Sequence, residues 1–358
     1  MAPVLARVER NGVVESVHRG HVVQAEVNGS LVRVAGDPDV VVTLRSAVKP
    51  FTLVALVDAG GVEAFALSTA ELALMTGSHS GEDVHVRTLQ AIFRRSGLSP
   101  SLLGCGADGM PLDALTAARL ARDGERPGVL RHMCSGQHAS FLLLAKLAGW
   151  QPAEYWRPDH PVAGAIRAVV CRALGIAPDR VVTAIDGCGI DTYAVPLRAV
   201  ARAYAFLADP GAIGRHDPRA SLVPALMAIR DAMLAHPEMV GGTRDRVDSA
   251  LMKALPGRVV SKAGGEALRG MGLVPGPRLA GPATGIATKI EDGDCRERAT
   301  RAVAVEALRQ AGAIDPPALR ALARYHRPSE RDPHGRMTAE TIADFDLAPV
   351  GELLGRSE

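Results

Sequence analysis

The chain has 358 residues, of which 47% are hydrophobic and only 3% aromatic, and a formal net charge of +2 at pH 7. This length suits one large domain, or a domain with a substantial insert, with a core filled by Ala, Leu and Val. Acidic and basic residues are interleaved, and no Lys/Arg run carries aromatic residues, which argues against a nucleic-acid partner.

The sequence also indicates where the protein works. No stretch reaches about 18 consecutive apolar residues, which argues against a membrane partner, and charge appears too early for a signal peptide. The five cysteines are odd in number and widely spaced, at Cys105, Cys134, Cys171, Cys188 and Cys295. We therefore expect reduced thiols and a cytoplasmic protein.

The first 45 residues are predicted to be rich in strands. Residues 22–27 and 31–34 flank Asn28-Gly29, a strong hairpin signal, and residues 40–44 form another strand candidate. Helical spacing then begins at Ser46 and continues to about residue 57. Ser46 is thus expected at a strand-to-helix junction, near the positive helix terminus and its backbone amides.

Helices are predicted for most of residues 60–180, at 68–77, 82–96, 111–123, 137–149 and 161–173. A short buried strand is expected at 181–185. Further helices are predicted at 191–208, 221–235 and 245–254, and strands at 258–262 and 285–290 with a helix after them. The whole chain, 1–358, is expected to form a single domain, with residues from about 325 to 358 as a loosely packed tail rich in Pro and Arg.

Lysine is scarce, because only five of the 41 basic residues are lysines. Lys49 follows Ser46 by three residues, on one face of the predicted helix. A desolvated lysine can lose its proton, which an arginine cannot do, so Lys49 can act as the base that activates a serine. Chance alone gives an S-x-x-K motif in roughly one such chain in five, so the motif is weak by itself.

Two later motifs strengthen this interpretation. Ser78-His79-Ser80 lies between two glycines, and Lys262-Ala263-Gly264 ends a predicted strand. The order S-x-x-K, S-x-[NS], K-[TSA]-G is that of serine β-lactamases and penicillin-binding proteins. A second Ser/Lys pair can relay protons or hold charged groups of the substrate, and two close lysines lower each other's pKa. The alternative for Lys262 is a solvated charge at the end of an edge strand.

A third cluster contains two thiols and a histidine. Cys134 and His138 lie one helical turn apart, and Cys188 lies in the glycine-rich loop 186–189. These groups could bind zinc with an open position, although the spacing matches no strong zinc signature. His79 and His138 could orient or bind a substrate, and Gly264 allows close approach of the backbone to a ligand. The alternative is that the cysteines are small buried hydrophobic residues.

Taken together, these motifs resemble the asparaginase II family, which is typified by the rhizobial inducible-type L-asparaginase. The segments that carry the resemblance are 45–51, 78–82, 133–139, 186–193, 262–266 and 285–294. They run in family order over residues from about 4 to 310. The resemblance implies an α/β (α+β) fold with an antiparallel sheet flanked by helices, like that of glutaminases and serine β-lactamases, and a homodimer.

The resemblance also implies a reaction, the hydrolysis of L-asparagine to L-aspartate and ammonia. By position, Ser46 with Lys49 and Ser78 with Lys262 form the two catalytic Ser–Lys pairs. The same comparison implies that the α-carboxylate and α-amino groups of the substrate are held by Arg45, His138 and Asp186. Cys134 and Cys188 are expected at the wall of the pocket.

The chain departs from the family pattern where zinc is concerned. Some members bind zinc through two cysteines and a lysine between them; Cys134 and Cys188 are present, but Gln137 stands at the position of the lysine. Glutamine is a poor zinc ligand, so we expect that no cofactor is required, unless His138 replaces the lysine. Asp248 also replaces a family cysteine. The rival hypotheses are a glutaminase, a penicillin-recognising hydrolase and a non-catalytic asparagine-binding protein.

Overall fold

The structure is a computed structural model that describes residues 1–106 and 110–351. Contacts divide the chain into two compact units. Unit 1 contains Met1–Ala47, Ala194–Ile213 and Ala250–Glu358, and unit 2 contains Val48–Tyr193 and Gly214–Ser249. The expected single domain stays a prediction.

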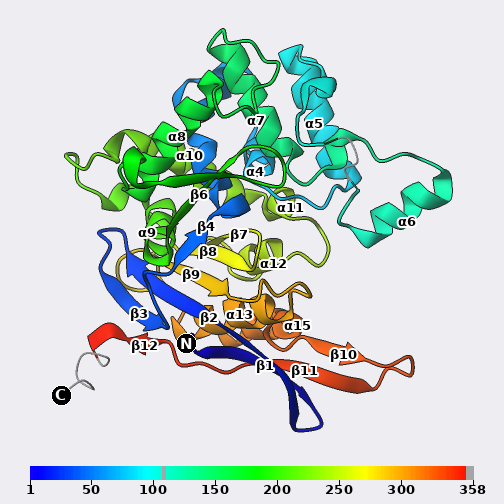
Figure 1. Ribbon diagram of the computed structural model, residues 1–358, viewed down its shortest axis with the longest axis vertical. Helices are drawn as coiled ribbons and strands as arrows, with labels where there is room; N and C mark the ends of the chain where they lie inside the picture. The colour runs from blue at the N-terminus through cyan, green and yellow to red at the C-terminus, as the bar shows by residue number, and fades with distance from the viewer. Residues whose placement is uncertain (107–109, 352–358) are drawn as a thin grey trace. The chain divides into compact units, whose positions relative to one another are not determined.

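Unit 1 is built on an antiparallel sheet that has nine strands in the described part of the chain. The strand order is β10-β11-β1-β2-β9-β8-β7, and β3 joins β2 to β12 (Figure 1). The strands are β1 (Val4–Arg10), β2 (Val13–Glu26), β3 (Leu31–Ala35), β7 (Val259–Ala263), β8 (Leu268–Leu273), β9 (Thr284–Ile290), β10 (Ser329–Arg331), β11 (Met337–Ala343) and β12 (Ala348–Pro349). The predicted hairpin is confirmed, since β2 pairs with β3 and Gly29 adopts a φ of 94°.

Helix α9 (Leu197–Ala208) packs on β2, β8 and β9, where glycines leave room for it (Figure 1). A Cβ atom added to Gly270 would lie 2.0 Å from the ring of Tyr204, and one added to Gly285 would lie 1.9 Å from the Ala201 carbonyl oxygen. The Tyr204 hydroxyl donates a hydrogen bond to the carbonyl oxygen of Ala47 at 2.7 Å. This contact ties the sheet to the segment that carries Ser46, within unit 1.

The C-terminal segment is part of the sheet, which corrects the prediction of a loosely packed tail. Strand β11 pairs with both β1 and β10, and β12 pairs with β3. Helices α13 (Arg298–Gln310), α14 (Pro316–Ala321) and α15 (Ala323–His326) precede these strands. Proline and arginine content misled the prediction, because Pro328, Pro333 and Pro349 lie at strand ends or in a turn, while Ala339 and Thr341 of β11 are buried. Residues 352–358 lie outside the described residues.

Glu306 anchors this segment. Its carboxylate, buried in α13, accepts hydrogen bonds from Arg309 at 2.6 Å, Gln310 at 2.8 Å and His326 of α15 at 3.0 Å. Burial alone would raise the pKa of Glu306, but these hydrogen bonds outweigh it and lower the pKa to about 2. The carboxylate therefore stabilises the fold while it is ionised.

Replacing Glu306 with glutamine is expected to lower the free energy of unfolding at pH 7 by about 1–2 kcal/mol. Since the folded pKa lies below the unfolded value of about 4.3, the stabilisation is complete above the unfolded value and is lost as the pH falls toward 2. Thermal unfolding at pH 7, 5 and 3.5 should show a difference in stability between the variant and wild type that becomes smaller as the pH falls. Glu297→Gln, an exposed change at the start of the same helix, is the control. A pH-independent difference would contradict the prediction.

Unit 2 is mainly helical, as the sequence predicts. Helices α1 (Lys49–Thr52) and α2 (Val54–Asp58) follow the 3-10 helix η1 (Arg45–Val48), so the predicted helix 46–57 forms in three short pieces. The remaining helices are α3 (Gly61–Ala64), α4 (Thr69–Met75), α5 (Asp83–Ser96), α6 (Ala114–Asp123), α7 (Ser135–Leu147), α8 (Pro161–Leu174), α10 (Val223–Ala235) and α11 (Pro237–Val240). Helix α7 is central, because residues 135–145 are all buried.

Further short elements complete the fold. Helix α12 (Val247–Ala254) confirms the prediction at 245–254. Short 3-10 helices occupy 100–102, 129–131, 178–180, 210–212 and 220–222.

A second sheet, of order β4-β6-β5, corrects two predictions. Its strands are β4 (Val41–Thr43), β5 (Val182–Ile185) and β6 (Asp191–Pro196). Residues 191–196 are a strand rather than the start of a helix, because Thr192, Tyr193 and Val195 favour a strand and Pro196 ends it. Strand β5 is an exposed edge strand rather than a buried one. Its apolar residues had suggested burial.

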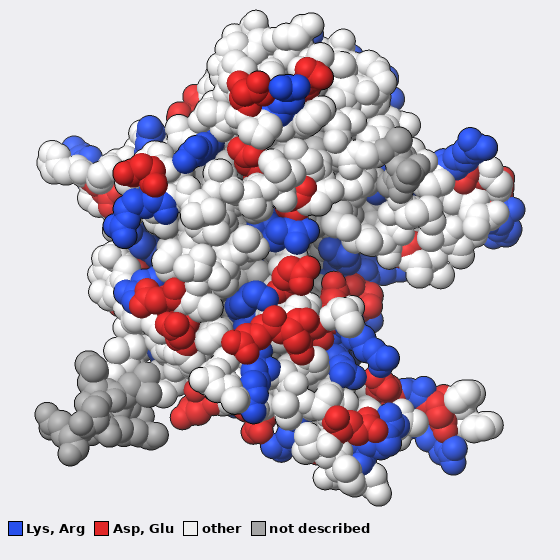
Figure 2. Space-filling model, in the orientation of Figure 1, with Lys and Arg blue, Asp and Glu red and all other residues white. Residues whose placement is uncertain are grey.

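The surface carries both signs of charge. Acidic and basic side chains are interspersed on the face shown in Figure 2. In the described ranges, no helix combines the length and the apolar character needed to cross a bilayer.

Candidate active site

Lys49 is the centre of the candidate site in unit 2. Its side chain is only 1% exposed, and its ammonium group must therefore find partners inside the protein. Nζ donates to the Gly77 carbonyl oxygen at 2.8 Å and lies 3.1 Å from Ser78 Oγ and 3.2 Å from Cys134 Sγ. The lysine therefore lies within hydrogen-bond distance of one serine hydroxyl and of one thiol.

The two predicted thiols lie together beside Lys49. A hydrogen bond from Cys188, the positive charge of Lys49 and a hydrogen bond with His132 lower the pKa of Cys134 well below its usual value. Donating its proton to Cys134, together with burial, raises the pKa of Cys188. Cys134 is thus held as the acceptor of the pair. Both thiols are reduced.

Ser78 is held at both ends of its peptide. Its N–H donates to the Val240 carbonyl oxygen at 3.0 Å, and its carbonyl oxygen accepts from Arg246 at 2.8 Å. The preceding residue must be glycine, because a Cβ on Gly77 would lie 2.7 Å from the Val240 carbonyl oxygen. Residues 240–246 therefore run alongside the 77–81 turn and fix the serine that contacts Lys49.

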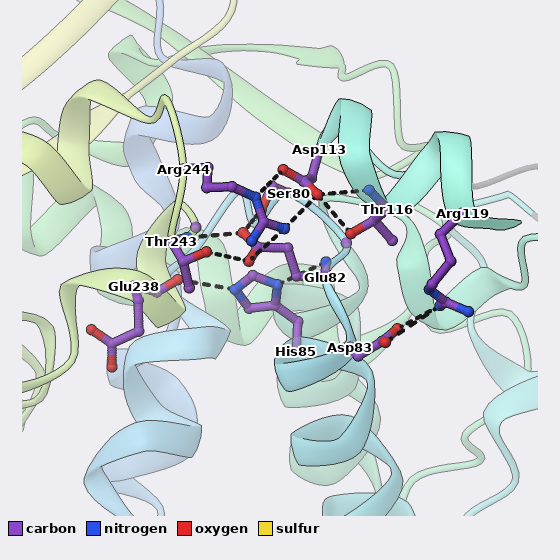
Figure 3. Close-up of polar contacts among 12 residues, drawn as sticks. Ser80, Glu82, Asp83, His85, Asp113, Thr116, Arg119, Glu238, Thr243 and Arg244 are labelled. Atoms are coloured by element: carbon purple, nitrogen blue, oxygen red, sulfur yellow. Dashed lines mark hydrogen bonds and ion pairs between the residues drawn. The ribbon is translucent and has the colours of Figure 1, made fainter.

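A buried carboxylate network holds these two segments together (Figure 3). Glu82 accepts from the Ser80 hydroxyl at 2.6 Å and from the Thr243 amide at 2.8 Å. Arg244 bridges Glu82 to Asp113, to which it makes two hydrogen bonds at 2.6 and 2.9 Å. Burial tends to raise the pKa of Glu82, but the hydrogen bonds from Ser80 and Thr243 bring it below its usual value. The network is therefore ionised at neutral pH.

Four of the predicted residues, Arg45, Ser46, Lys262 and Gly264, lie in unit 1. Lys262 is fully buried in β7, and its Nζ donates to the Ala263 carbonyl oxygen at 2.6 Å. The backbone at Gly264 lies close to the segment before Ser46, since a Cβ there would be 2.6 Å from the Leu44 carbonyl oxygen. Arg45 has a φ of 48°, a strained conformation of the kind that gathers at functional sites. Unit 1 therefore places Leu44 and Ala47, on either side of Arg45 and Ser46, next to Gly264.

Comparison with known proteins identifies the family of this chain. The sequence matches the L-asparaginase II family over residues 6–342, nearly the whole chain. The chain belongs to the L-asparaginase II family. This membership points to an amidohydrolase of the asparaginase/glutaminase kind that acts on a small-molecule amide. A search of functionally characterised proteins found no match.

Solved structures similar to this L-asparaginase II chain include two glutaminases. One is a probable glutaminase from Bacillus subtilis complexed with 6-diazo-5-oxo-L-norleucine, with 12% identity, a TM-score of 0.33 and coverage of 84% of this chain and 78% of that one. The other is a Bacillus glutaminase in the presence of 4.3 M NaCl, with 13% identity, a TM-score of 0.40 and coverage of 82% and 91%. The antiparallel sheet flanked by helices agrees with the expected fold class.

The donor set does not fit the zinc site found in some L-asparaginase II proteins. Cys134 already contacts Lys49 and Cys188, and the amide of Gln137 donates to Thr52 at 3.3 Å. The described residues contain no group of three or more His, Cys, Asp or Glu side chains that could hold a metal ion.

The two predicted substrate-binding histidines, His79 and His138, differ in how many of their ring nitrogens are bonded to protein groups. His79 is fully buried, its Nδ1 accepts from the Gly81 amide at 3.2 Å, and its Nε2 therefore donates to Ser135 at 2.9 Å. Since both ring nitrogens bind protein groups, this geometry argues against the predicted contact with substrate. The imidazole stays neutral, because burial lowers its pKa well below the usual value. His138 keeps one ring nitrogen for a ligand, as described below.

Asp186 lies in the turn between β5 and β6. Its carboxylate accepts from the Gly187 amide at 2.6 Å, and Gly189 in the same turn has a φ of 90°. Only glycine adopts that conformation readily. The turn thus presents Asp186 and the buried Cys188 together.

Sequence reasoning missed several residues that support the L-asparaginase II site. They are Arg246, Arg244, Glu82 and Tyr155. The scarcity of tyrosine, with four in the chain, was a usable signal for Tyr155. The arginines carried none, because 36 of the 41 basic residues are arginines.

Proposed function

We propose that this protein is an L-asparaginase that hydrolyses L-asparagine to L-aspartate and ammonia. Family membership supports an amidohydrolase, and one observation supports the Ser–Lys chemistry. That observation is the burial of Lys49 within hydrogen-bond distance of the Ser78 hydroxyl. A lysine in this setting can exchange a proton with a serine, which is the step that a serine amidohydrolase needs.

In the proposed reaction, one serine, Ser46 by preference, attacks the side-chain amide carbonyl of the substrate. Lys49, in its neutral amine form, accepts the hydroxyl proton and then delivers it to the leaving ammonia, which breaks the C–N bond, leaves an acyl-enzyme and returns Lys49 to the neutral form. Water then attacks the ester and releases L-aspartate. Backbone amides near the start of the helix stabilise the oxyanion, and one such donor contributes about 3 kcal/mol to lowering the barrier.

The remaining roles follow from the family resemblance. Ser78 and Lys262 form the second pair, and Arg45, His138 and Asp186 bind the α-carboxylate and α-amino groups. Gly264 lets the backbone approach the substrate. We further propose a cytoplasmic homodimer that needs no metal.

The test is ammonia release from L-asparagine and L-glutamine, each with and without added Zn²⁺, together with hydrolysis of nitrocefin. The proposal predicts that L-asparagine is preferred, that Zn²⁺ has no effect and that nitrocefin is not hydrolysed. Preference for glutamine or nitrocefin would support the corresponding rival enzyme. Calorimetric binding of L-asparagine without formation of aspartate would instead support a non-catalytic binding protein.

A further inference from the structure

Among the residues that the structure describes, none is a hydrogen-bond partner of one ring nitrogen of His138. The side chain is fully buried in α7, and within the described residues Nε2 makes no hydrogen bond. An unsatisfied buried donor or acceptor costs about 1–3 kcal/mol, so an orphan of this kind calls for a missing ligand. The other nitrogen, Nδ1, lies 2.5 Å from the Tyr155 hydroxyl.

The hydrogen bonds of Tyr155 decide which nitrogen of His138 carries the proton. The Tyr155 oxygen accepts from the Gly104 amide at 2.9 Å, and burial raises the pKa of Tyr155, so the hydroxyl keeps its proton. If this hydroxyl donates to Nδ1, the Gly104 amide, the Tyr155 hydroxyl and His138 Nδ1 all have hydrogen-bond partners, and only Nε2–H has none. The opposite arrangement would leave the Tyr155 proton without a described acceptor.

His138 is neutral as well as oriented. Burial lowers its pKa to about 3, and the positive charge of Lys49 adds to this effect. The rings of His138 and Tyr155 meet edge to face with centroids 5.6 Å apart, which holds the imidazole plane in place. The site therefore presents a single, fixed, uncharged N–H donor.

We propose that Tyr155 is a positioning residue that fixes His138 as the Nε2–H tautomer, so that this N–H donates to the α-carboxylate of the substrate. The inference rests on the proposed function. The family resemblance does not say which residue binds the α-carboxylate and which binds the α-ammonium group, and the tautomer of His138 distinguishes these two roles. An N–H donor can bind a carboxylate but not an ammonium group, so the α-ammonium falls to the acceptor Asp186.

Three probes separate these two ends of the substrate. L-aspartate carries both α-groups, succinamate lacks the amino group and 3-aminopropanamide lacks the α-carboxylate. Dissociation constants are measured by calorimetry on the full chain, for wild type and for Tyr155→Phe. L-aspartate has no side-chain amide and binds without turnover, and ammonia released from the two amide probes is assayed in parallel. Failure of the asparaginase proposal shows separately, as absence of ammonia release from L-asparagine.

Tyr155→Phe is expected to weaken binding of L-aspartate and succinamate about tenfold and to leave binding of 3-aminopropanamide unchanged. Tyr193→Phe, which removes another buried tyrosine hydroxyl from the same unit, should change none of the three. In a His138→Gln background, Tyr155→Phe should have no further effect on succinamate, since the tautomer no longer exists.

Three results would overturn the proposal. Equal weakening of all three probes would indicate a general structural role. Weakening confined to 3-aminopropanamide would place His138 at the ammonium end of the substrate. The third result is binding of L-aspartate that is unchanged in Tyr155→Phe or absent in wild type. Thermal melting of each variant shows whether it has kept its fold.

Discussion

Replacing Lys49 with methionine is expected to reduce ammonia release from L-asparagine by at least about a thousandfold. Methionine is apolar and of similar length, so it can occupy the buried space but can neither accept nor deliver a proton. The structure gives Lys49 three hydrogen-bond partners, and Ser78 and Cys134 would each lose one. The kinetic loss should therefore come with a measurable change in thermal stability.

Lys146→Met is the matched control, because Lys146 is exposed at the end of α7. It makes the same chemical change away from the candidate site and should leave turnover within about twofold of wild type. Turnover near the wild-type rate in Lys49→Met would remove the proposed base. A variant that is inactive because it has unfolded would show no cooperative melting transition, and the more conservative Lys49→Arg would then be used. Arginine keeps the charge but cannot give up its proton, so the same loss of turnover is expected.

Replacing Ser46 with alanine is expected to abolish both ammonia release and the acyl-enzyme. Ser46 is the proposed nucleophile, and an alanine cannot form the ester. Mass spectrometry of rapidly quenched reactions should detect an acyl group on a peptide that contains Ser46 in wild type. No such adduct should form in Ser46→Ala.

Ser78→Ala provides the comparison, since Ser78 is the hydroxyl that lies 3.1 Å from Lys49. We expect it to slow turnover by about a hundredfold while the adduct on Ser46 still forms, because Ser78 then acts in proton transfer. An adduct on Ser78 would reverse the two roles and contradict the assignment of Ser46, while leaving the asparaginase proposal intact. The exposed Ser101→Ala is the neutral control.

Local sequence patterns predicted the elements whose structure is decided locally. The hairpin at Asn28-Gly29 and the helix α5 formed where turn chemistry and helical spacing placed them. Strand β5 shows the limit of such reasoning. Its apolar residues suggested burial, but whether a strand lies at an edge depends on its neighbours, which are distant in sequence. Strand β8 was missed because two of its six residues are glycines, which weaken a strand when read alone.

The sequence predicted which residues belong to the candidate site better than it predicted which of them contact one another. Lys49, Ser78 and Cys134 were all named from motifs, and the structure brings them together. The contact between Lys49 and Ser78 was not foreseen, because the motif spacing paired Lys49 with Ser46 and the family resemblance paired Ser78 with Lys262. Whether Ser46 contacts Lys49 stays a prediction. The role of Tyr155 depends on the hydrogen of one hydroxyl, which no spacing in the sequence encodes.

The glycines of β8 have a consequence for how this protein tolerates change. Gly270 lies so close to Tyr204 that even a methyl group on this strand would push the ring away. That ring carries the hydroxyl bonded to the Ala47 carbonyl oxygen, one residue beyond Ser46. A substitution of Gly270 in the middle of the sheet would therefore displace the Tyr204 ring, and with it the backbone next to the proposed nucleophile Ser46.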